Sequence, residues 1–452
     1  MTNVKVGDQL EVVVKRLGIN AEGIAYEQRL AIFIDEALPG EVVKIEITQV
    51  FEKYAVAKII EIIKASDHRL PIEYPDLQAC GAFGMQHVTY EYLLVQTRFI
   101  LIDALKRYLQ EDKLNHLVKS IVHLEPLGYR NKVSMPVRRI EGSNKFGYYK
   151  IGTTDFISAN FSPVHHPRIN EITQYLEELL NYYRLDGYIA KEKSGYLKSV
   201  VIRRTHYHGE IQVSFLLMKK FAEINKVISD LTNKFSDIKS VYAFYTDDYK
   251  QQVFFTNDYE KLFGKETINE KLNQQTFSLF PESFWQLNTP VAQSFYQKIV
   301  ELAKLKESDI VIDAYAGSAI ISHYIAKYVK KVYAIEIDQK SVQSAIRSLK
   351  TNNINNVTVL QSDFKKALKN LINEKIDVMI FDPARPGLGQ ECIKEILKFK
   401  PTKIVYGSCN PSTLAKDLSL LTPAYKIEQV IPFDMFPHTP LVESITVLTL
   451  KG

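Results

Sequence analysis

The C-terminal part of the chain alternates two kinds of apolar segment, and this alternation restricts the possible folds more than any other feature. From Pro290 onward, short apolar runs are separated by longer runs with helical spacing. The short runs are DIVIDAYAG, KKVYAIEID, VTVLQSDF, IDVMIFDPA and KIVYGSC, and the helical ones include AIISHYIAKYV, QKSVQSAIRSLKTNN, KKALKNLIN and QECIKEILKF. Strands that alternate with helices form βαβ units. We therefore predict a doubly wound parallel sheet, a Rossmann-like α/β domain, over residues 281–452.

The first 64 residues have a different pattern, in which polar and apolar residues alternate with period two. The segments VGDQLEVVVKRL, LAIFIDEAL and EVVKIEITQV show it, and turn residues such as Gly23 and Pro39-Gly40 lie between them. Short strands with regular turns favour a small antiparallel β-barrel of the oligonucleotide-binding type over residues 1–64. Such a barrel fits RNA binding, and it fits a passive docking module equally well.

Residues 65–280 mix strand and helix patterns without a regular alternation. NKVSMPVRRI, SVVIRR and IQVSFLLM are typical of strands, whereas INEITQYLEELLNYY and a segment from about Tyr90 to Gln110 have helical spacing. We predict a central α+β region here. The chain of 452 residues is thus expected to be a multidomain α/β protein with domains at 1–64, 65–280 and 281–452.

Composition restricts the class of protein. Hydrophobic residues make up 46% of the chain and charged residues 24%, which indicates a globular protein. No apolar run approaches the ~20 residues that span a bilayer, and the N-terminus has no apolar signal core. The cysteines Cys80, Cys392 and Cys409 are too far apart in sequence for a disulfide framework or a CxxC metal site. We expect a cytoplasmic protein with no membrane partner; the net charge of +5 permits a nucleic-acid partner without requiring one.

Acidic residues follow several of the predicted parallel strands, at the edge where doubly wound sheets bind their ligands. Glu336 lies 19 residues after Gly317, a spacing that suits the two hydroxyls of a ribose, and Asp363 could accept from an adenine amine. The first turn, DAYAGSA, lacks the second glycine of a dinucleotide-binding turn. S-adenosylmethionine, which has no phosphate, fits this set better. The alternative is that Glu336 and Asp363 are simply solvated strand ends.

A cysteine stands where the strand KIVYGSC ends, and it is the candidate nucleophile. Lone cysteines are usually packing residues, and Cys392, within the helical stretch QECIKEIL, fits that description. Cys409 differs because turn residues, Ser408 and Asn410, flank it. The N-terminus of the following helix is expected to favour its thiolate.

Several of these segments together resemble the RNA uracil-5 methyltransferases, which form 5-methyluridine in transfer RNA or in large-subunit ribosomal RNA. FDPAR, SCNPSTLAKD and HTPLVES resemble their motifs, and FWQLN, at residues 284–288, is similar to their FxQxN element. AEGIA and LPGE in the first 64 residues resemble the TRAM domain of the 23S ribosomal RNA branch. YRNKVSMPVR, at residues 129–138, resembles the central domain. The resemblance spans nearly the whole chain.

The resemblance implies roles for particular residues. It implies that Cys409 is the nucleophile, that Glu443 is the base and that Asp382 orients the uracil. The implied contacts to S-adenosylmethionine are Gln286, Tyr315, Gly317, Glu336, Asp363 and Asp382, and the implied contacts to RNA are Phe284, Asp382, Arg130, Lys132 and Arg138. A thiolate that adds to carbon 6 makes carbon 5 of uracil nucleophilic, and a base must then remove the proton from carbon 5.

The implied function is methylation of carbon 5 of a uridine in RNA, with 23S ribosomal RNA as the first candidate. Two alternatives stay open: a transfer RNA uridine-5 methyltransferase, and a non-catalytic RNA-binding relative with an impaired cofactor site. A methyltransferase for an amide or adenine is disfavoured, because such enzymes need no thiol. RNA is the expected partner, and we expect a monomer.

Two departures from the family pattern bear on cofactors. The motif YCGxGT is Tyr315 to Ile320 here, and Ala319 replaces its second glycine, so a methyl group is expected close to S-adenosylmethionine. The iron–sulfur motif CGGCxxQH of many members is changed in ACGAFGMQH, where Cys80 remains and Phe83 replaces the second cysteine. A cluster needs four ligands. We therefore expect no iron–sulfur cluster and no metal site.

Overall fold

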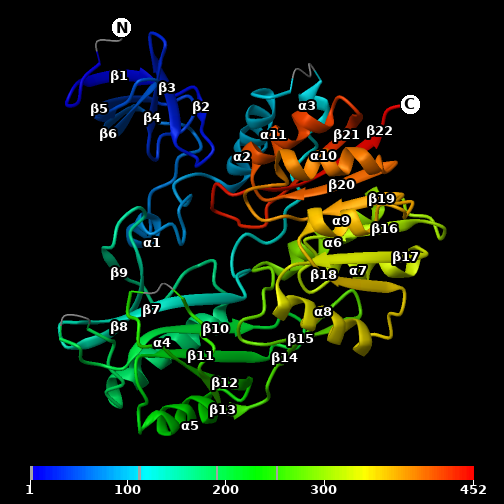
Figure 1. Cartoon of the computed structure of the whole chain (residues 1–452). Helices are drawn as coiled ribbons and strands as arrows, with labels where there is room; N and C mark the ends of the chain where they lie inside the picture. The colour runs from blue at the N-terminus through cyan, green and yellow to red at the C-terminus, as the bar shows by residue number, and fades with distance from the viewer. Residues whose placement is uncertain (1–3, 110–112, 190–191, 251–252) are drawn as a thin grey trace.

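The chain folds around three main sheets, which Figure 1 shows as a barrel in blue, a central sheet in cyan and green, and a C-terminal sheet in yellow to red. The computed structural model describes residues 4–109, 113–189, 192–250 and 253–452. No helix within these ranges is both long and apolar enough to cross a membrane. The predicted multidomain α/β architecture is confirmed.

The N-terminal sheet closes into a barrel. Its strands are β1 (Gln9–Val13), β2 (Arg16–Leu17), β3 (Gly23–Glu27), β4 (Leu30–Ile34), β5 (Val42–Val50) and β6 (Tyr54–Lys64). Strand β1 pairs with β5, and β2, which follows it after two residues, pairs with β3. This continuous segment therefore joins the two edges of the sheet. The apolar half of the period-two pattern fills the interior. The prediction of a wholly antiparallel barrel is wrong in one place, because β4 and β6 are parallel neighbours.

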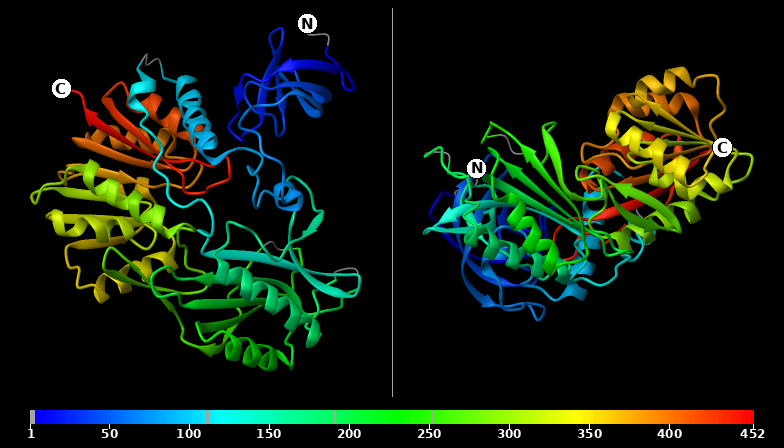
Figure 2. Two further views of the ribbon diagram at one scale, coloured as in Figure 1. Left: turned by 180° about the vertical axis from the view of Figure 1, so that it is seen from behind. Right: turned by 90° about the horizontal axis from the view of Figure 1, so that it is seen from below.

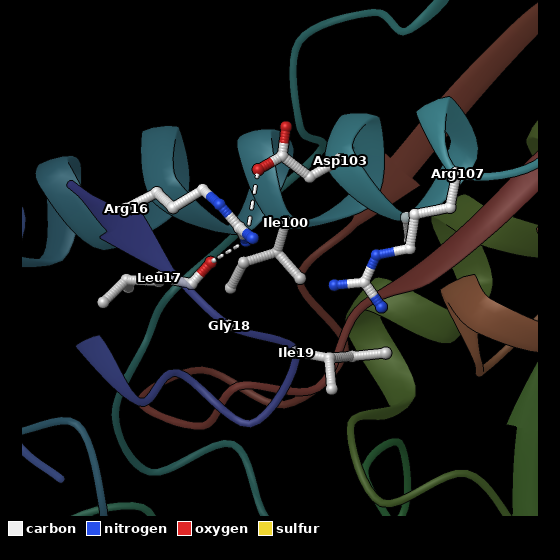
Figure 3. A pocket seen from close by; sticks show the side chains of 8 residues that line it. Arg16, Leu17, Gly18, Ile19, Ile100, Asp103 and Arg107 are labelled. Carbon is white, nitrogen blue, oxygen red and sulfur yellow. Dashed lines mark hydrogen bonds and ion pairs between the residues drawn. The ribbon is translucent and has the colours of Figure 1, made fainter. Parts of the chain in front are cut away.

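The barrel contacts the helix α2 (Tyr90–Lys106), which ends before the predicted end at Gln110; residues 107–109 are not helical, and Gln110 itself lies outside the described residues. Leu17 and Leu38 of the barrel share a small apolar cluster with Ile100 of α2. Beside this cluster Arg16 approaches the carboxylate of Asp103 at 3.6 Å, as Figure 3 shows. The barrel is therefore held against the helix by apolar packing with an ion pair at its edge.

The helices of the central domain pack on one face of its sheet. Its strand order is β13-β12-β11-β10-β7-β8-β9. The strands are β7 (Lys132–Ile140), β8 (Ser143–Tyr149), β9 (Phe156–Ser158), β10 (Leu197–Arg204), β11 (Ile211–Leu217), β12 (Ile238–Tyr245) and β13 (Tyr259–Gly264). Helices α4 (Pro167–Tyr182) and α5 (Ile224–Lys234) pack on the face that carries Val133, Met135 and Val137. Lys132 and Arg138 alternate with these residues along β7, so they belong to the opposite face.

The C-terminal sheet has the order β18-β17-β16-β19-β20-β22-β21. Its strands are β16 (Ile310–Ala314), β17 (Lys331–Glu336), β18 (Val357–Gln361), β19 (Val378–Phe381), β20 (Lys403–Ser408), β21 (Tyr425–Phe433) and β22 (Glu443–Leu450). Its helices are α6 (Thr289–Ala303), α7 (Ile320–Ile325), η1 (Ala326–Tyr328), α8 (Gln339–Thr351), α9 (Phe364–Asn370), α10 (Gly389–Phe399) and α11 (Pro411–Leu421). The first five strands in this order are parallel, as predicted, whereas β22 runs antiparallel to both β20 and β21. The sheet is therefore mixed rather than wholly parallel.

Two segments of the predicted central region, 65–280, pack instead on the C-terminal domain. Leu101 and Leu105 of α2 share a core with Leu418 of α11, and Figure 1 and the left view of Figure 2 both show the two helices side by side. The hairpin of β14 (Ile268–Leu272) and β15 (Gln275–Leu279) shares a second core with α6. The short helices α1 (Pro75–Ala79) and α3 (Leu114–Leu117) lie in the connections around α2. Periodicity identifies these elements but does not indicate which apolar face each one covers.

Candidate active site

The sheet order brings three candidate catalytic residues together from distant parts of the sequence. Asp382 follows β19, Cys409 follows β20, and Glu443 is the first residue of β22. Strand β20 lies between the other two, and its Ser408 is paired with Ser444. Because β22 is antiparallel to β20, its first residue meets the carboxyl end of β20. The chain's two candidate carboxylates thus stand on either side of its candidate thiol.

These residues border a cavity of about 660 Å³. From the predicted site it gathers Phe284, Gln286, Tyr315, Gly317, Glu336, Asp382, Cys409 and Glu443. The volume falls in the range of small-molecule sites. The lining residues precede and follow the first cofactor turn, Tyr315 to Ser318, in the sequence. One cavity therefore contains most of the residues proposed for the cofactor and those proposed for the chemistry.

The turns that carry Asp382 and Cys409 are fastened to each other. The backbone oxygen of Arg385 accepts hydrogen bonds from Asn410 Nδ2 at 3.1 Å and from Thr413 Oγ1 at 3.0 Å. Asp417 of α11 is buried and accepts from the backbone N–H groups of Leu388 and Gly389. These bonds hold the loop after β19 against the first turns of α11, so the two strand ends cannot move independently.

A glycine allows the close approach of β20 to Asp382. A Cβ atom at Gly407 would lie 3.1 Å from Asp382 Oδ1 and 3.0 Å from Phe295 Cζ. Both distances are shorter than ordinary van der Waals contact. Any side chain at Gly407 would therefore displace the carboxylate or the ring.

Burial keeps the acids of this cavity protonated to unusually high pH. The surrounding protein atoms raise the pKa of Asp382 to about 7, although part of its surface borders the cavity. Burial, and then the nearby Asp382 carboxyl, raise the pKa of Glu443 to about 8; the Arg385 guanidinium acts in the opposite direction. Behind them, burial raises the pKa of Asp313 to about 7, even though Ser322 donates to its carboxyl. The cavity thus holds several acids and little positive charge.

The same surroundings act on the thiol. Burial and the carboxylates of Glu443 and Asp382 raise the pKa of Cys409 to about 11. In the free protein, burial and these two carboxylates therefore outweigh any gain of the thiolate from the N-terminus of α11.

The first cofactor turn is attached to the end of β17 through one carboxylate. Glu336 accepts from the backbone N–H of Gly317 at 2.9 Å with one oxygen, and from Ile337 and Asp338 at 2.7 and 2.8 Å with the other. A carboxylate oxygen can accept more than one hydrogen bond, so hydroxyl donors can still bind here. Tyr315, with a φ of 60°, turns the chain sharply after β16. The arrangement fits a ribose at Glu336, and the under-compensated acids beside it fit a positively charged sulfonium.

Ala319 does not crowd the cavity, and the expectation that its methyl group would do so is wrong. The residue is fully buried and packs with Ala334 and Ala345 behind the turn. Its neighbours Gly317 and Ser318 border the cavity instead. Ala319 does adopt a left-handed backbone with a φ of 60°, which is unfavourable for alanine. The substitution therefore acts on backbone strain rather than on cofactor space.

The structure leaves four predicted site residues outside the cavity. Asp363 is exposed and caps α9, where it accepts from the backbone N–H of Lys366 at 3.2 Å. Arg130 donates to the backbone oxygen of Lys132 at the start of β7. Lys132 lies over the ring of Phe255, and burial lowers its pKa to about 7. Arg138 lies beside Tyr149 farther along β7. Any contact of these residues with RNA is separate from the cavity.

Several residues that sequence reasoning missed also line the cavity. Arg385 supplies a cation near Glu443 and Cys409, because its guanidinium lowers the pKa of both groups against the effect of burial. Ile337 directly follows Glu336 and is 66% exposed, which provides an apolar surface for a flat ring. Tyr296, Phe436 and Leu441 complete the wall. Arg385 belongs to the FDPAR motif and Leu441 to HTPLVES, so both could have been assigned to the site; Ile337, Tyr296 and Phe436 have no sequence signal of their own.

The segment around Cys80 packs under the loop that leads to Glu443. The ring of Phe83 lies 4.6 Å from that of His438, and the backbone N–H of Met85 donates to His438 O at 3.0 Å. Tyr90 donates to Asp434 at 2.6 Å in the same loop. Within the described ranges, no group of three or more His, Cys, Asp or Glu residues is placed to hold a metal ion. Phe83 therefore serves here as an apolar support.

Comparison with known proteins shows which proteins the chain resembles. The profile of the tRNA (Uracil-5-)-methyltransferase family matches residues 167–451, and that of the TRAM domain matches residues 3–60. An uncharacterized RNA methyltransferase of Bacillus anthracis is 31% identical over 100% of this chain and 98% of its own length. An uncharacterized RNA methyltransferase of Halalkalibacterium halodurans is 32% identical over 99% of this chain and 98% of its own length. The solved structure of Pyrococcus abyssi tRNA (uracil-54, C5)-methyltransferase in complex with S-adenosyl-L-homocysteine has a TM-score of 0.77, at 24% identity, over 97% of this chain and 100% of that one.

The raised pKa of Glu443 predicts a pH-dependent effect of Glu443→Gln on stability. The pKa is about 8 in the folded protein against 4.5 for the ordinary carboxyl, so burial of this group lowers stability progressively as pH rises from about 4.5 to 8. Thermal melting should show that the Tm advantage of Glu443→Gln over the wild type grows across this window and is constant above it. Glu307→Gln, at an exposed position, should follow the wild-type curve. Parallel curves for Glu443→Gln and the wild type would refute the burial argument.

We also predict that the purified protein contains no iron. Phe83 occupies the position of a cluster ligand, and Cys80 alone cannot supply four thiolates. Iron and acid-labile sulfide should both be far below one per chain in protein prepared without oxygen. A brown protein with stoichiometric iron and sulfide would contradict this.

Proposed function

The chain belongs to the tRNA (uracil-5-)-methyltransferase family, and we propose that it methylates carbon 5 of a uridine in RNA through a covalent bond to Cys409. The observation that carries this proposal is the convergence of Cys409, Asp382 and Glu443 on one cavity that also contains Glu336. A thiol between two carboxyls suits addition to a pyrimidine ring followed by removal of a proton.

Cys409 begins the proposed reaction. Its thiol proton leaves to solvent through the open cavity, and the sulfur adds to carbon 6 of the uracil. The electron pair of the double bond moves toward the carbonyl oxygen at carbon 4, which leaves carbon 5 nucleophilic. Asp382 accepts a hydrogen bond from the ring N–H and so holds the uracil over the sulfur.

Glu443 completes the proposed reaction. Once carbon 5 carries the new methyl group, the Glu443 carboxylate takes the proton from carbon 5. The electron pair left behind restores the double bond to carbon 6, and the bond from carbon 6 to sulfur breaks. Cys409 leaves as a thiolate, and Glu443 returns its proton to solvent. The balance is one hydrogen on carbon 5 exchanged for a methyl group.

S-adenosylmethionine, when bound, supplies that methyl group from its sulfonium. We propose that Glu336 holds the ribose, that the turn at Tyr315 and Gly317 borders the cofactor, and that Ile337 packs on the adenine. Gln286 lies on the same cavity wall. Asp363, at the exposed cap of α9, is a weaker candidate for the adenine amine.

The first candidate for the substrate is 23S ribosomal RNA. The N-terminal barrel matches the TRAM domain. In the family that the sequence resembles, this domain is typical of the branch that acts on 23S ribosomal RNA. Transfer RNA is the second candidate, because the Pyrococcus abyssi enzyme that shares this fold acts on it. Phe284, 70% exposed at the cavity mouth, and Arg130, Lys132 and Arg138 of the central sheet are the proposed RNA contacts.

Mass spectrometry of nuclease digests decides between the two substrates. 5-Methyluridine should disappear from one site in 23S ribosomal RNA when the gene is deleted, and it should return with the intact gene but not with a Cys409→Ala copy. A loss confined to the transfer RNA fraction would reject the ribosomal assignment. Calorimetric titration with S-adenosylmethionine tests the remaining alternative, a non-catalytic relative, which should not bind the cofactor.

We predict that Cys409→Ala lowers methyl transfer by several orders of magnitude and leaves RNA binding intact, because no other group can make carbon 5 nucleophilic. Transfer of a radiolabelled methyl group to RNA measures the loss. Cys392→Ala is the matched control, since Cys392 lies in α10, packs against the core beside Tyr315 and should be dispensable. Appreciable activity of Cys409→Ala would reject the mechanism.

Glu443→Gln should stop the reaction at a later step. Attack by Cys409 and methyl transfer precede proton removal, so this variant should accumulate a protein–RNA adduct that survives a denaturing gel. The adduct should require both Cys409 and S-adenosylmethionine. Normal turnover by Glu443→Gln, or no adduct while Cys409 remains reactive, would show that Glu443 is not the base.

A further inference from the structure

A second cavity, of about 300 Å³, lies between the central sheet and the C-terminal domain. Its walls combine apolar residues with three basic side chains, His166, Arg204 and His206. Asn288 lies in its lining and is 1% exposed. The mechanism above uses none of these residues.

Asn288, which belongs to the lining of this cavity, has an unused hydrogen-bond donor. Its Oδ1 accepts from the backbone N–H of Val291 and so caps α6, which identifies the other side-chain atom as the amide nitrogen. That nitrogen is buried and has no hydrogen-bond partner. A buried donor without a partner costs stability, so its presence indicates a ligand that accepts a hydrogen bond.

The charges around this donor favour an anion. Arg204 donates to the backbone oxygen of Thr205, and no ion pair within the described ranges includes its guanidinium. Asp237 and Glu270 act on the Arg204 guanidinium electrostatically, and both have other hydrogen-bond partners. Asp237 accepts from Arg168 at 2.7 and 2.9 Å, and Glu270 accepts from the backbone N–H of Tyr207 at 2.9 Å.

Two helices also begin at this cavity. His166 caps α4 with Nδ1, which accepts from the backbone N–H of Arg168, so its Nε2 carries the proton and can donate. Asn288 caps α6, and the positive ends of both helix dipoles therefore face the cavity. Glu125 is the carboxylate on its rim, where it is exposed and its charge is screened by solvent.

The second cavity adjoins the active site through one short segment. Gln286 borders the large cavity and Asn288 borders the second one. Asn131 fixes this segment, because its Nδ2 donates to Gln286 O at 2.8 Å and to Thr289 Oγ1 at 2.9 Å. The backbone N–H of Arg204 donates to Asn131 O at 2.8 Å. Arg204 and Asn288 are therefore positioned by the same residue that positions Gln286.

We propose that the second cavity binds a backbone phosphate of the RNA substrate, at a nucleotide beside the uridine that enters the large cavity. Arg204 and Asn288 contact the phosphate oxygens, and the apolar wall formed by Leu124, Leu127 and Pro290 packs on the attached nucleoside. The position beside the uridine rests on the proposed function. The phosphate contact fixes the register of the strand, so that one uridine reaches Cys409.

Asn288→Asp is the most informative variant. Aspartate caps a helix as well as asparagine does, so α6 should remain stable, but the donor becomes a negatively charged oxygen. Fluorescence anisotropy with labelled decauridylate should show affinity reduced by about tenfold or more. Asn288→Ser, which keeps the capping oxygen and adds no charge, should lose less. Calorimetric binding of S-adenosylmethionine should be unchanged in both, which shows that each variant is folded.

Arg204→Gln tests the charge by a different readout. The slope of log affinity against log salt should fall by about 0.7, the value for one phosphate on a single strand, and Arg204→Lys should restore much of it. Lys330 is exposed and precedes β17, at the end of the strand away from Glu336 and the large cavity. Lys330→Gln should therefore change neither the affinity nor the slope. Wild-type affinity and slope in both Asn288→Asp and Arg204→Gln would overturn the proposal.

Inorganic phosphate, compared with chloride at equal ionic strength, separates the two possible sources of the anion. Phosphate should displace decauridylate from the wild type more strongly than chloride does. In Asn288→Asp the two anions should displace it equally. Variants that lose phosphate competition but keep full affinity for decauridylate would show a site for a free anion and refute the RNA assignment. These are binding measurements without methyl transfer, so failure of the Cys409 chemistry would not alter their interpretation.

Discussion

The antiparallel pairing of β22 with β20 is the constraint on which the active site depends. The carboxyl ends of β16, β17, β19 and β20 all lie at one edge of the sheet, and ligands of such sheets bind there. A parallel last strand would place its first residue at the opposite edge. Because β22 is reversed, Glu443 reaches the edge that carries Cys409, and the register of Ser408 with Ser444 fixes how closely the two approach.

This placement has an electrostatic consequence. Burial raises the pKa of Asp313, Asp382 and Glu443, and the nearby cation is Arg385. Buried carboxyls without compensating charge destabilise a fold at alkaline pH, and sites of this kind usually serve a function. A sulfonium provides the missing positive charge and would lower all of these pKa values. In the free protein, burial therefore favours the protonated forms of these acids and of the Cys409 thiol, and a bound cation would oppose that effect.

Much of this could be predicted from the sequence, and the failures have physical reasons. Period-two and helical patterns identified the barrel and the alternating strands, and strand ends identified Cys409, Asp382 and Glu336, because local periodicity determines burial and direction. Periodicity does not determine which strands pair, so the reversal of β22 and the packing of α2 on α11 were not predictable. The pKa of Cys409 depends on carboxylates distant in sequence. The direction of the Ala319 methyl group depends on a left-handed backbone that spacing does not show.

The central claim is that Cys409 bonds to carbon 6 of the substrate uracil, and 5-fluorouridine tests it most directly. Fluorine replaces the hydrogen that Glu443 must remove, so the wild-type enzyme should stop at the methylated adduct. RNA transcribed with 5-fluorouridine should be incubated with the enzyme and S-adenosylmethionine, digested with nuclease and protease, and analysed by mass spectrometry. The account predicts one modified peptide, which contains Cys409 and carries a fluorouridine nucleotide plus one methyl group. An unmodified Cys409 peptide in enzyme that methylates normal RNA, or an adduct on Cys392 or Cys80, would contradict it.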